Sequence, residues 1–242
     1  ALIAGQLKQP GRLTLQLRGN GPVQLLVMDC NEQLQMRGMA RSNPVVLPAP
    51  VPELLGAHQG GQLMMSLDLP TARQPYQSYV PMVGDSIAAI FEHYLEQSEQ
   101  QPSRLFAIAG PQAAVCLFLQ KMPEADHHDQ DGWNRITQLA ATVKPAELLG
   151  LDAEDLLTRL FHDDMETHGI RVYDPLPVVY HCPEDWDKVR DMIRSIGRAD
   201  AETILAEHGE ILIRDDICNR EYRFTPDDVA ALFAASEGKA LH

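Results

Sequence analysis

A short run of alternating apolar residues and a second apolar run, separated by a turn signal, constrain the fold of this chain most strongly. Leucines alternate with polar residues over 13–17, which is the two-residue period of a half-buried β-strand. A Gly-Asn-Gly-Pro sequence at 19–22 follows, and a second apolar run occupies 23–28. Because glycine and proline interrupt strands and favour turns, residues 11–41 are predicted to be β structure.

Two more strand-like stretches, at 63–69 and 104–119, lie on either side of a helix signal. Asp85 is placed to cap this helix, whose apolar residues recur at helical spacing. They are Ile87, Ile90, Phe91, Tyr94 and Leu95. An α+β core domain with a mixed sheet is therefore predicted at 1–128. The opening residues 1–5 resemble the end of a helix, so we expect the N-terminal part of this domain to be missing.

The composition changes at 124–131, where Asp, His and Gln dominate. The following stretch has helical periodicity, with Asp152 as its expected cap. Its apolar stripe consists of Leu156, Leu157, Leu160 and Phe161. Because Pro175 and Pro177 then interrupt the chain, a helical linker is predicted at 129–178.

A small α+β domain is predicted at 179–242. Its expected elements are helices at 184–196 and 200–207, strands at 211–214 and 222–224, and a last helix that begins at Thr225. Gly209 is a typical residue at which a helix ends. Thr225 is followed by proline and two acidic residues, which favours the start of a helix. Proline suits the first helical position, and acidic side chains interact favourably with the positive N-terminal end of the helix dipole.

The composition disfavours several classes of partner. Apolar residues make up 45% of the chain, which supports a packed core. Lys and Arg total 20 and Asp and Glu total 34, giving a formal charge of −14. This charge repels phosphate backbones and anionic lipids, so neither nucleic acid nor a membrane is an expected partner. The sequence also contains no glycine-rich phosphate-binding loop, so no ATP binding is expected.

The four cysteines are sparse and far apart, unlike those of a small secreted domain. They are Cys30, Cys116, Cys182 and Cys218. A reducing, cytoplasmic setting is therefore expected. Cys116 lies in an apolar run and Cys30 lacks a basic neighbour, so neither is predicted to be functional.

Short motifs follow one another in a characteristic order along nearly the whole chain. They are Gln35-Met36-Arg37-Gly38, Tyr76-Gln77, Val83-Gly84, the Glu-Gln-Ser-Glu-Gln sequence at 96–100, Pro102-x-Arg104-Leu105-Phe106, Val172-Tyr173-Asp174-Pro175, Ile204-Leu205, Gly209-Glu210-Ile211 and Tyr222-x-Phe224. Together they resemble the 33 kDa redox-regulated heat-shock chaperone family. The resemblance implies an ATP-independent holdase, not an enzyme, that binds unfolded client proteins under heat or oxidative stress. It leaves a homodimer open.

The resemblance also implies a redox switch in the C-terminal domain. In the family, a Cys-x-Cys pair and a later Cys-x-x-Cys pair bind zinc through four thiolates, and oxidation to two disulfides releases the metal and unfolds the domain. The corresponding residues here are Cys182, Glu184, Asp215 and Cys218. Carboxylates replace two thiolates, so neither of the family's two disulfides can form.

Three interpretations of this degenerate switch are open. In the first, the four residues still bind a metal ion, although two lost thiolates disfavour zinc and no cofactor is firmly predicted. In the second, no metal binds and the carboxylates pair with Lys188, Arg214 or Arg220. In the third, Cys182 and Cys218 form one reversible disulfide and are the redox-switch candidates.

The predicted function is client binding through apolar surface, for which the linker stripe is the candidate, although an ordinary core would show the same pattern. The alternatives are a thiol oxidoreductase that uses Cys182 and Cys218, a hydrolase that uses Ser86, and a non-catalytic degenerate paralogue that acts as an interaction module. A Cys-x-x-Cys pair would favour the oxidoreductase, and the sequence contains none. It also contains no Asp-x-x-His block that would complete the catalytic triad of a hydrolase.

Overall fold

The computed structural model describes residues 1–7 and 9–237. It contains two compact units, the first made of Ala1–Gln35 and Ala40–Val179 and the second of Met36–Met39 and the chain from Tyr180 onward. Both units combine helices with strands, which confirms the α+β fold class. The three-part division at 1–128, 129–178 and 179–242 stays a prediction. Among the described residues, no helix has the length and apolar character needed to cross a bilayer.

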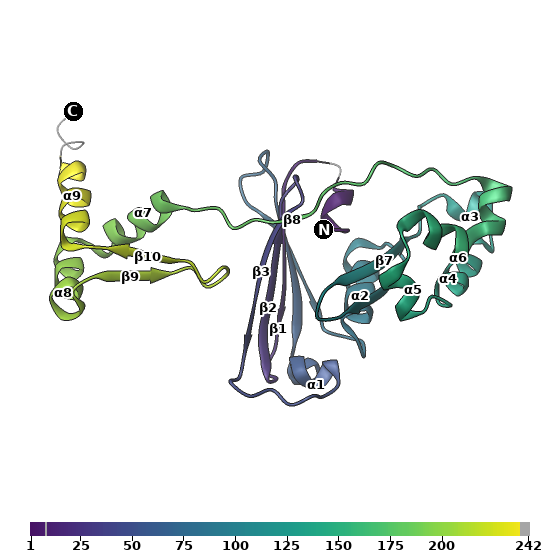
Figure 1. Cartoon of the computed structure of the whole chain (residues 1–242), viewed down its shortest axis with the longest axis horizontal. Coiled ribbons are helices and arrows are strands. Elements are labelled where there is room, and N and C mark those ends of the chain that lie inside the picture. Colours follow the sequence, from purple (N-terminus) through teal and green to yellow (C-terminus); the bar gives the residue numbers. More distant parts are fainter. Residues whose placement is uncertain (8, 238–242) are drawn as a thin grey trace. The chain divides into compact units, whose positions relative to one another are not determined.

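A six-stranded sheet with the order β5-β4-β1-β2-β3-β8 contains the first five strands of the chain and β8 (Figure 1). Its strands are β1 (Arg12–Arg18), β2 (Val23–Cys30), β3 (Gln35–Ser42), β4 (Gln62–Asp68), β5 (Tyr76–Pro81) and β8 (Val179–Tyr180). β1 pairs antiparallel with β2 and β4, so Leu17 lies opposite both Leu26 and Leu63. The β structure predicted at 11–41 is confirmed as β1, β2 and β3.

The turn between β1 and β2 needs glycine at position 21 because helix α1 (Val51–Leu55) ends against this turn. α1 is followed by Gly56 at φ +65°, a left-handed conformation that glycine adopts without strain. A Cβ atom on Gly21 would lie 2.3 Å from the carbonyl oxygen of Leu54. A larger residue at position 21 would therefore push α1 away from the turn.

Helix α2 (Ile87–Glu99) contacts β5 and β6 and buries Ile90, Tyr94 and Leu95. Its cap is Ser86, whose Oγ accepts a hydrogen bond from the Ala89 N–H at 3.1 Å. The cap predicted at Asp85 is therefore wrong. Ser86 has the extended backbone of an N-cap, and Asp85 lies one residue too early to reach the first turn.

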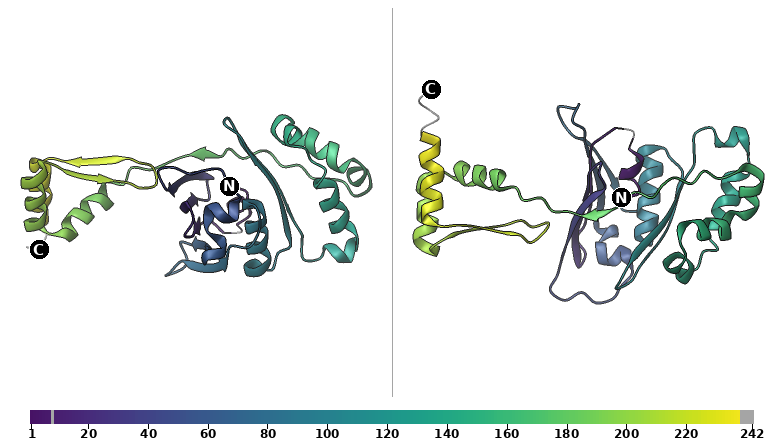
Figure 2. Two further views of the ribbon diagram at one scale, coloured as in Figure 1. Left: turned by 90° about the horizontal axis from the view of Figure 1, so that it is seen from below. Right: turned by 45° about the horizontal axis from the view of Figure 1, so that its top comes forward.

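A separate two-stranded hairpin, β6 (Ser103–Ala109) and β7 (Ala114–Gln120), follows α2. Its register places Phe106 opposite Leu117 and Ile108 opposite Val115, so all four share one face. The next helices are α3 (Ala125–His128), α4 (Gly132–Ala140), α5 (Pro145–Gly150) and α6 (Ala153–His168). The last three bury residues against this face, and Figure 2 shows them beside the hairpin.

The smaller unit contains α7 (Trp186–Ile196), α8 (Arg198–His208), β9 (Ile211–Arg214), β10 (Glu221–Phe224) and α9 (Pro226–Glu237). The predicted elements of this region are confirmed to within two residues. Its buried core consists of Val189, Ile193, Ala201, Ile211, Tyr222, Phe224, Val229 and Leu232. A reciprocal capping box starts α9: Thr225 Oγ1 accepts from the Asp228 N–H at 3.3 Å, and Asp228 Oδ2 accepts from the Thr225 N–H at 2.8 Å.

We expect Ser86→Ala to lower the free energy of unfolding by about 1 kcal/mol, because it removes the side-chain acceptor at the start of α2. Asp85→Ala is the matched control and should change stability by only a few tenths of a kcal/mol. Urea unfolding measures both variants. A larger loss for Asp85→Ala than for Ser86→Ala would contradict the assigned cap.

Candidate functional site

Cys182 and Cys218 are joined by a disulfide, the third of the three interpretations open from the sequence. Their Cα atoms are 6.3 Å apart and the bridge spans 36 positions of sequence. Cys182 precedes α7, and Cys218 lies in the loop between β9 and β10. Figure 1 shows this loop at the end of the hairpin opposite to α8 and α9. The disulfide therefore ties the start of the smaller unit to the tip of its hairpin.

Asp215 organises the loop that carries Cys218. Its Oδ1 accepts hydrogen bonds from the backbone N–H groups of Ile217 at 2.8 Å and Cys218 at 3.3 Å. The Asp215 N–H donates to the carbonyl oxygen of Arg220 at 2.8 Å. This carboxylate thus serves as a local turn former, which is a common use of aspartate.

Glu184 is engaged on both of its oxygens by neighbours. One carboxylate oxygen accepts a hydrogen bond from Nε1 of Trp186 at 3.1 Å, and the other lies 3.5 Å from Nη1 of Arg220. The pairing with Arg220 is one of the ion pairs that the second interpretation proposed. Within the described chain, the only group that could hold a metal consists of Cys182, Asp215 and Cys218, with candidate ligand atoms within 4.8 Å of one another.

These residues do not fit the zinc ion that the family resemblance implies. Structural zinc takes four ligands in a tetrahedron, with thiolate sulfur preferred. Here the two sulfurs are bonded to each other, and Glu184 is held by Trp186 and Arg220. Asp215 accepts hydrogen bonds from its own loop. Both sulfurs, both Glu184 oxygens and Oδ1 of Asp215 are therefore already engaged.

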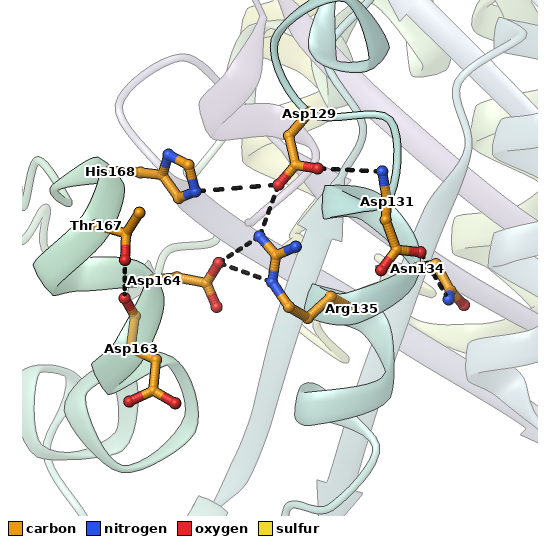
Figure 3. A network of polar contacts seen from close by, with 8 residues as sticks. All are labelled: Asp129, Asp131, Asn134, Arg135, Asp163, Asp164, Thr167 and His168. Atoms are coloured by element: carbon orange, nitrogen blue, oxygen red, sulfur yellow. Dashed lines mark hydrogen bonds and ion pairs between the residues drawn. The ribbon is translucent and has the colours of Figure 1, made fainter.

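A second polar cluster joins the helices that follow β7. The Arg135 side chain on α4 donates to Oδ1 of Asp164 on α6, from Nη2 at 2.6 Å and from Nε at 3.1 Å (Figure 3). Nη2 also contacts Oδ2 of Asp129 at 2.7 Å, and His168 Nε2 lies 3.9 Å from the same oxygen. The hydrogen bond from Arg135 lowers the pKa of Asp129, and the two aspartates raise the pKa of Arg135. Asp164 itself is buried.

This arginine cluster lies at the wall of a mainly apolar pocket of about 540 Å³. The pocket is lined by residues of β7, α3, α4 and α6, among them Trp133, Ile136, Leu157 and Phe161. The sequence did not predict the cluster because its three charged residues are 6 and 29 positions apart and follow no helical period.

The linker stripe lies in a core. Leu156, Leu160 and Phe161 are buried, whereas Leu157 is half-buried and lines the pocket. A role for the stripe in client binding stays a prediction, since these side chains reach a client only where the helices part from the hairpin.

The other candidate residues, Cys30, Cys116 and Ser86, have structural rather than catalytic surroundings. Cys30 is buried, and Cys116 is half-buried in β7, where burial raises the pKa of its thiol. A raised thiol pKa lowers the thiolate fraction at neutral pH, so Cys116 is a weak nucleophile. Ser86 caps α2, and its Oγ is used as an acceptor there.

The family model described as Hsp33 protein matches residues 1–225 of the chain. The 33 kDa chaperonin of Methylobacillus flagellatus is 37% identical over 235 residues, covering 96% of this chain and 78% of that protein. The 33 kDa chaperonin of Shewanella sp. strain ANA-3 is 36% identical over 239 residues, covering 98% and 80%.

A solved structure shares the fold. The crystal structure of the 33 kDa chaperonin (heat shock protein 33 homolog) from Thermotoga maritima matches with a TM-score of 0.78 and 22% identity, covering 98% of this chain and 82% of that chain. These similarities place the chain among chaperones rather than enzymes. The chain belongs to the Hsp33 family.

We expect purified protein to carry far less than one zinc ion per chain, because both sulfurs and both Glu184 oxygens are engaged elsewhere. Elemental analysis after dialysis measures this. The matched control is the double variant Glu184→Cys, Asp215→Cys, which restores four thiolates and should bind about one zinc when purified reduced. Stoichiometric zinc in the unaltered protein after mild chelation would contradict the poor fit.

We expect Arg135→Ala to destabilise the α4–α6 packing by about 1–3 kcal/mol, because Asp164 loses its partner while buried. Trp133, which lines the adjacent pocket, reports the change by fluorescence during urea unfolding. The control is Arg159→Ala, which removes a more exposed ion pair with Glu147 and should cost about 1 kcal/mol or less.

The effect of Arg135→Ala depends on pH with a defined sign. A carboxyl whose folded pKa is lowered stabilises the fold above its unfolded pKa, about 4, and this contribution is lost as pH falls through the folded value. The stability difference between wild type and Arg135→Ala should therefore shrink below about pH 4. A difference that grows in acid would contradict the role of Asp129.

Proposed function

We propose that this protein is an ATP-independent holdase that binds partly unfolded proteins under heat or oxidative stress. Membership of a chaperone family supports this proposal. The observation that carries it is the cluster between the β6–β7 hairpin and helices α4–α6. Five residues of this cluster are buried, and nine further apolar side chains are only half-buried.

This cluster is well suited to opening. A two-stranded hairpin is marginally stable without a covering layer, so the hairpin and the helices stabilise each other. α6 is also interrupted at Phe161, whose backbone departs from helical geometry at φ −128° and ψ 25°. Regions with few buried contacts open at lower free energy than the rest of a protein. Heating would thus separate these helices from the hairpin before the six-stranded sheet unfolds.

Opening would expose apolar surface on both sides of the cluster. The hairpin contributes Phe106, Ile108, Val115, Leu117 and Leu119, and the helices contribute the stripe Leu156, Leu157, Leu160 and Phe161. Burial of apolar area contributes about 25 cal/mol per Å² and is not directional, which suits binding of many different clients. We assign client binding to this stripe on these grounds.

The remaining parts of the proposal concern organisation and setting. Residues 1–128 serve as the chaperone core, 129–178 as the linker that opens, and 179–242 as a redox-switch-like domain. The formal charge of −14 disfavours nucleic acid and anionic membranes as partners. We propose a cytoplasmic setting without ATP, and leave a homodimer open. The proposed trigger differs from that of the family switch, because Glu184 and Asp215 stand where the resemblance places cysteines.

The test is light scattering by a client protein that aggregates on heating. Equimolar chaperone should suppress the scattering without ATP. The apolar surface that is exposed when helices α4–α6 separate from the hairpin would bind the apolar segments through which the client aggregates. Addition of ATP should change nothing. Unaltered client aggregation at every temperature tested, in both reduced and oxidised protein, would overturn the holdase assignment and favour an interaction module.

A pair of variants separates the stripe from general surface. Leu157→Ser changes a half-buried residue of the stripe, whereas Leu149→Ser changes an exposed leucine on α5. We expect Leu157→Ser to weaken client protection several-fold, and Leu149→Ser to leave it near wild type. Equal loss in both variants would contradict the stripe as the binding surface.

A further inference from the structure

We propose that the Cys182–Cys218 disulfide replaces the metal in holding the smaller unit together, so that reduction, rather than oxidation, loosens it. The proposal deepens the function given above, since it states how the holdase is regulated. It stands on how the four switch positions are used in this chain. It gives the switch the opposite sign from a zinc switch that oxidation opens.

Four contacts gather where the segment before α7 meets the β9–β10 hairpin. The disulfide is the covalent one. The Asp185 N–H donates to the Tyr222 hydroxyl at 3.2 Å, and the Trp186 ring meets the Tyr222 ring edge-on at 4.8 Å between centroids. The fourth contact is the ion pair between Glu184 and Arg220. All four contacts hold the segment before α7 against the β9–β10 hairpin. A metal ion with ligands from this segment and from the hairpin would hold them together in the same way.

The Glu184 charge at this junction is balanced without a metal. Arg220 supplies a positive charge to Glu184, and its Nη1 atom is buried without a hydrogen-bond partner in the part of the chain that the structure describes. A divalent cation placed near this guanidinium would be repelled, because the two charges have the same sign. The replaced positions thus disfavour a metal in two ways, by engaging the ligands and by adding a cation.

The disulfide carries stability because the smaller unit has a small core. Eight residues are buried in its cluster. Units of this size commonly need a disulfide or a metal in addition to their apolar core. The bridge closes a loop with a sequence separation of 36, which restricts the unfolded chain more than the folded one. Losing the bridge therefore shifts the unit towards its open state.

The redox step balances with ordinary thiol chemistry. A dithiol reductant supplies two electrons and two protons, the S–S bond breaks, and Cys182 and Cys218 become thiols while the reductant becomes a disulfide. Hydrogen peroxide reverses the step: it takes two electrons and two protons from the thiols, the S–S bond forms again, and two water molecules leave. Reducing conditions therefore open the unit more easily, and peroxide closes it.

The two tryptophans allow each unit to be followed separately, since Trp186 lies in the smaller unit and Trp133 in the larger. In the variant Trp133→Phe, the remaining Trp186 reports thermal unfolding of the smaller unit. We expect dithiothreitol to lower the midpoint of this transition by about 10 °C or more. In Trp186→Phe, the transition reported by Trp133 should not shift in this way.

Cysteine variants provide the matched controls. In the Trp133→Phe background, Cys182→Ser with Cys218→Ser should unfold at the reduced midpoint with or without dithiothreitol. Cys30→Ser with Cys116→Ser should keep the full shift, because these cysteines are not bridged to each other or to the switch. A midpoint that is unchanged or raised by reduction overturns the proposal. So does a reduced protein that a chelator destabilises by a comparable amount, because a metal would then hold the unit.

This measurement uses no client, so its outcome is independent of the holdase assay. A midpoint shift without client protection supports the disulfide and overturns only the holdase. When client protection is present, we expect the reduced protein to protect at a lower temperature than the oxidised protein. Protection that appears only after oxidation, and is lost in the double serine variant, would overturn the proposed sign of the switch.

Discussion

The part of the larger unit that follows α2 depends on one interaction, the packing of helices α4–α6 on the apolar face of the β6–β7 hairpin. Two strands expose their apolar face unless another layer packs on it. Helices α4–α6 supply that layer, with Leu156, Leu160 and Phe161 against the hairpin residues. The segment that the sequence identified as a linker therefore contributes structure to the same compact unit as the sheet. Its helices are held by apolar packing and by the ion pairs of Arg135 and Arg159.

Arg135 illustrates how a polar contact can control an apolar one. The arginine joins α4 to a buried aspartate on α6, at the edge of the pocket formed by the same helices. Such a contact contributes modest stability, because both charges must leave water before they pair. Its two hydrogen bonds to Asp164 also link α4 to α6 in a defined geometry.

The smaller unit shows what a carboxylate does at a position that resembles a thiolate ligand position. A carboxylate carries the same charge as a thiolate but lacks its soft sulfur donor. Its oxygens bond to neighbouring N–H groups and to a nearby arginine instead. Asp215 caps the turn that carries Cys218, and Glu184 pairs with Arg220. Cys182 and Cys218 bond to each other.

The sequence by itself determined the elements, because local periodicity and capping depend on residues a few positions apart. The strands at 11–41, the helix started by Thr225 and the α+β class follow from such patterns. The cap of α2 was missed by one residue, since either Asp85 or Ser86 satisfies the pattern, and the structure shows the Ser86 side chain accepting from the Ala89 N–H.

Tertiary structure alone decided which distant groups meet. The contact of Arg135 with Asp164 crosses 29 positions, and the Cys182–Cys218 bridge crosses 36. The sequence left that bridge as one of three alternatives, because one spacing serves metal ligands, ion pairs and disulfides alike. Only the packing of α7 and the β9–β10 hairpin brings the two sulfurs together and turns Glu184 towards Arg220.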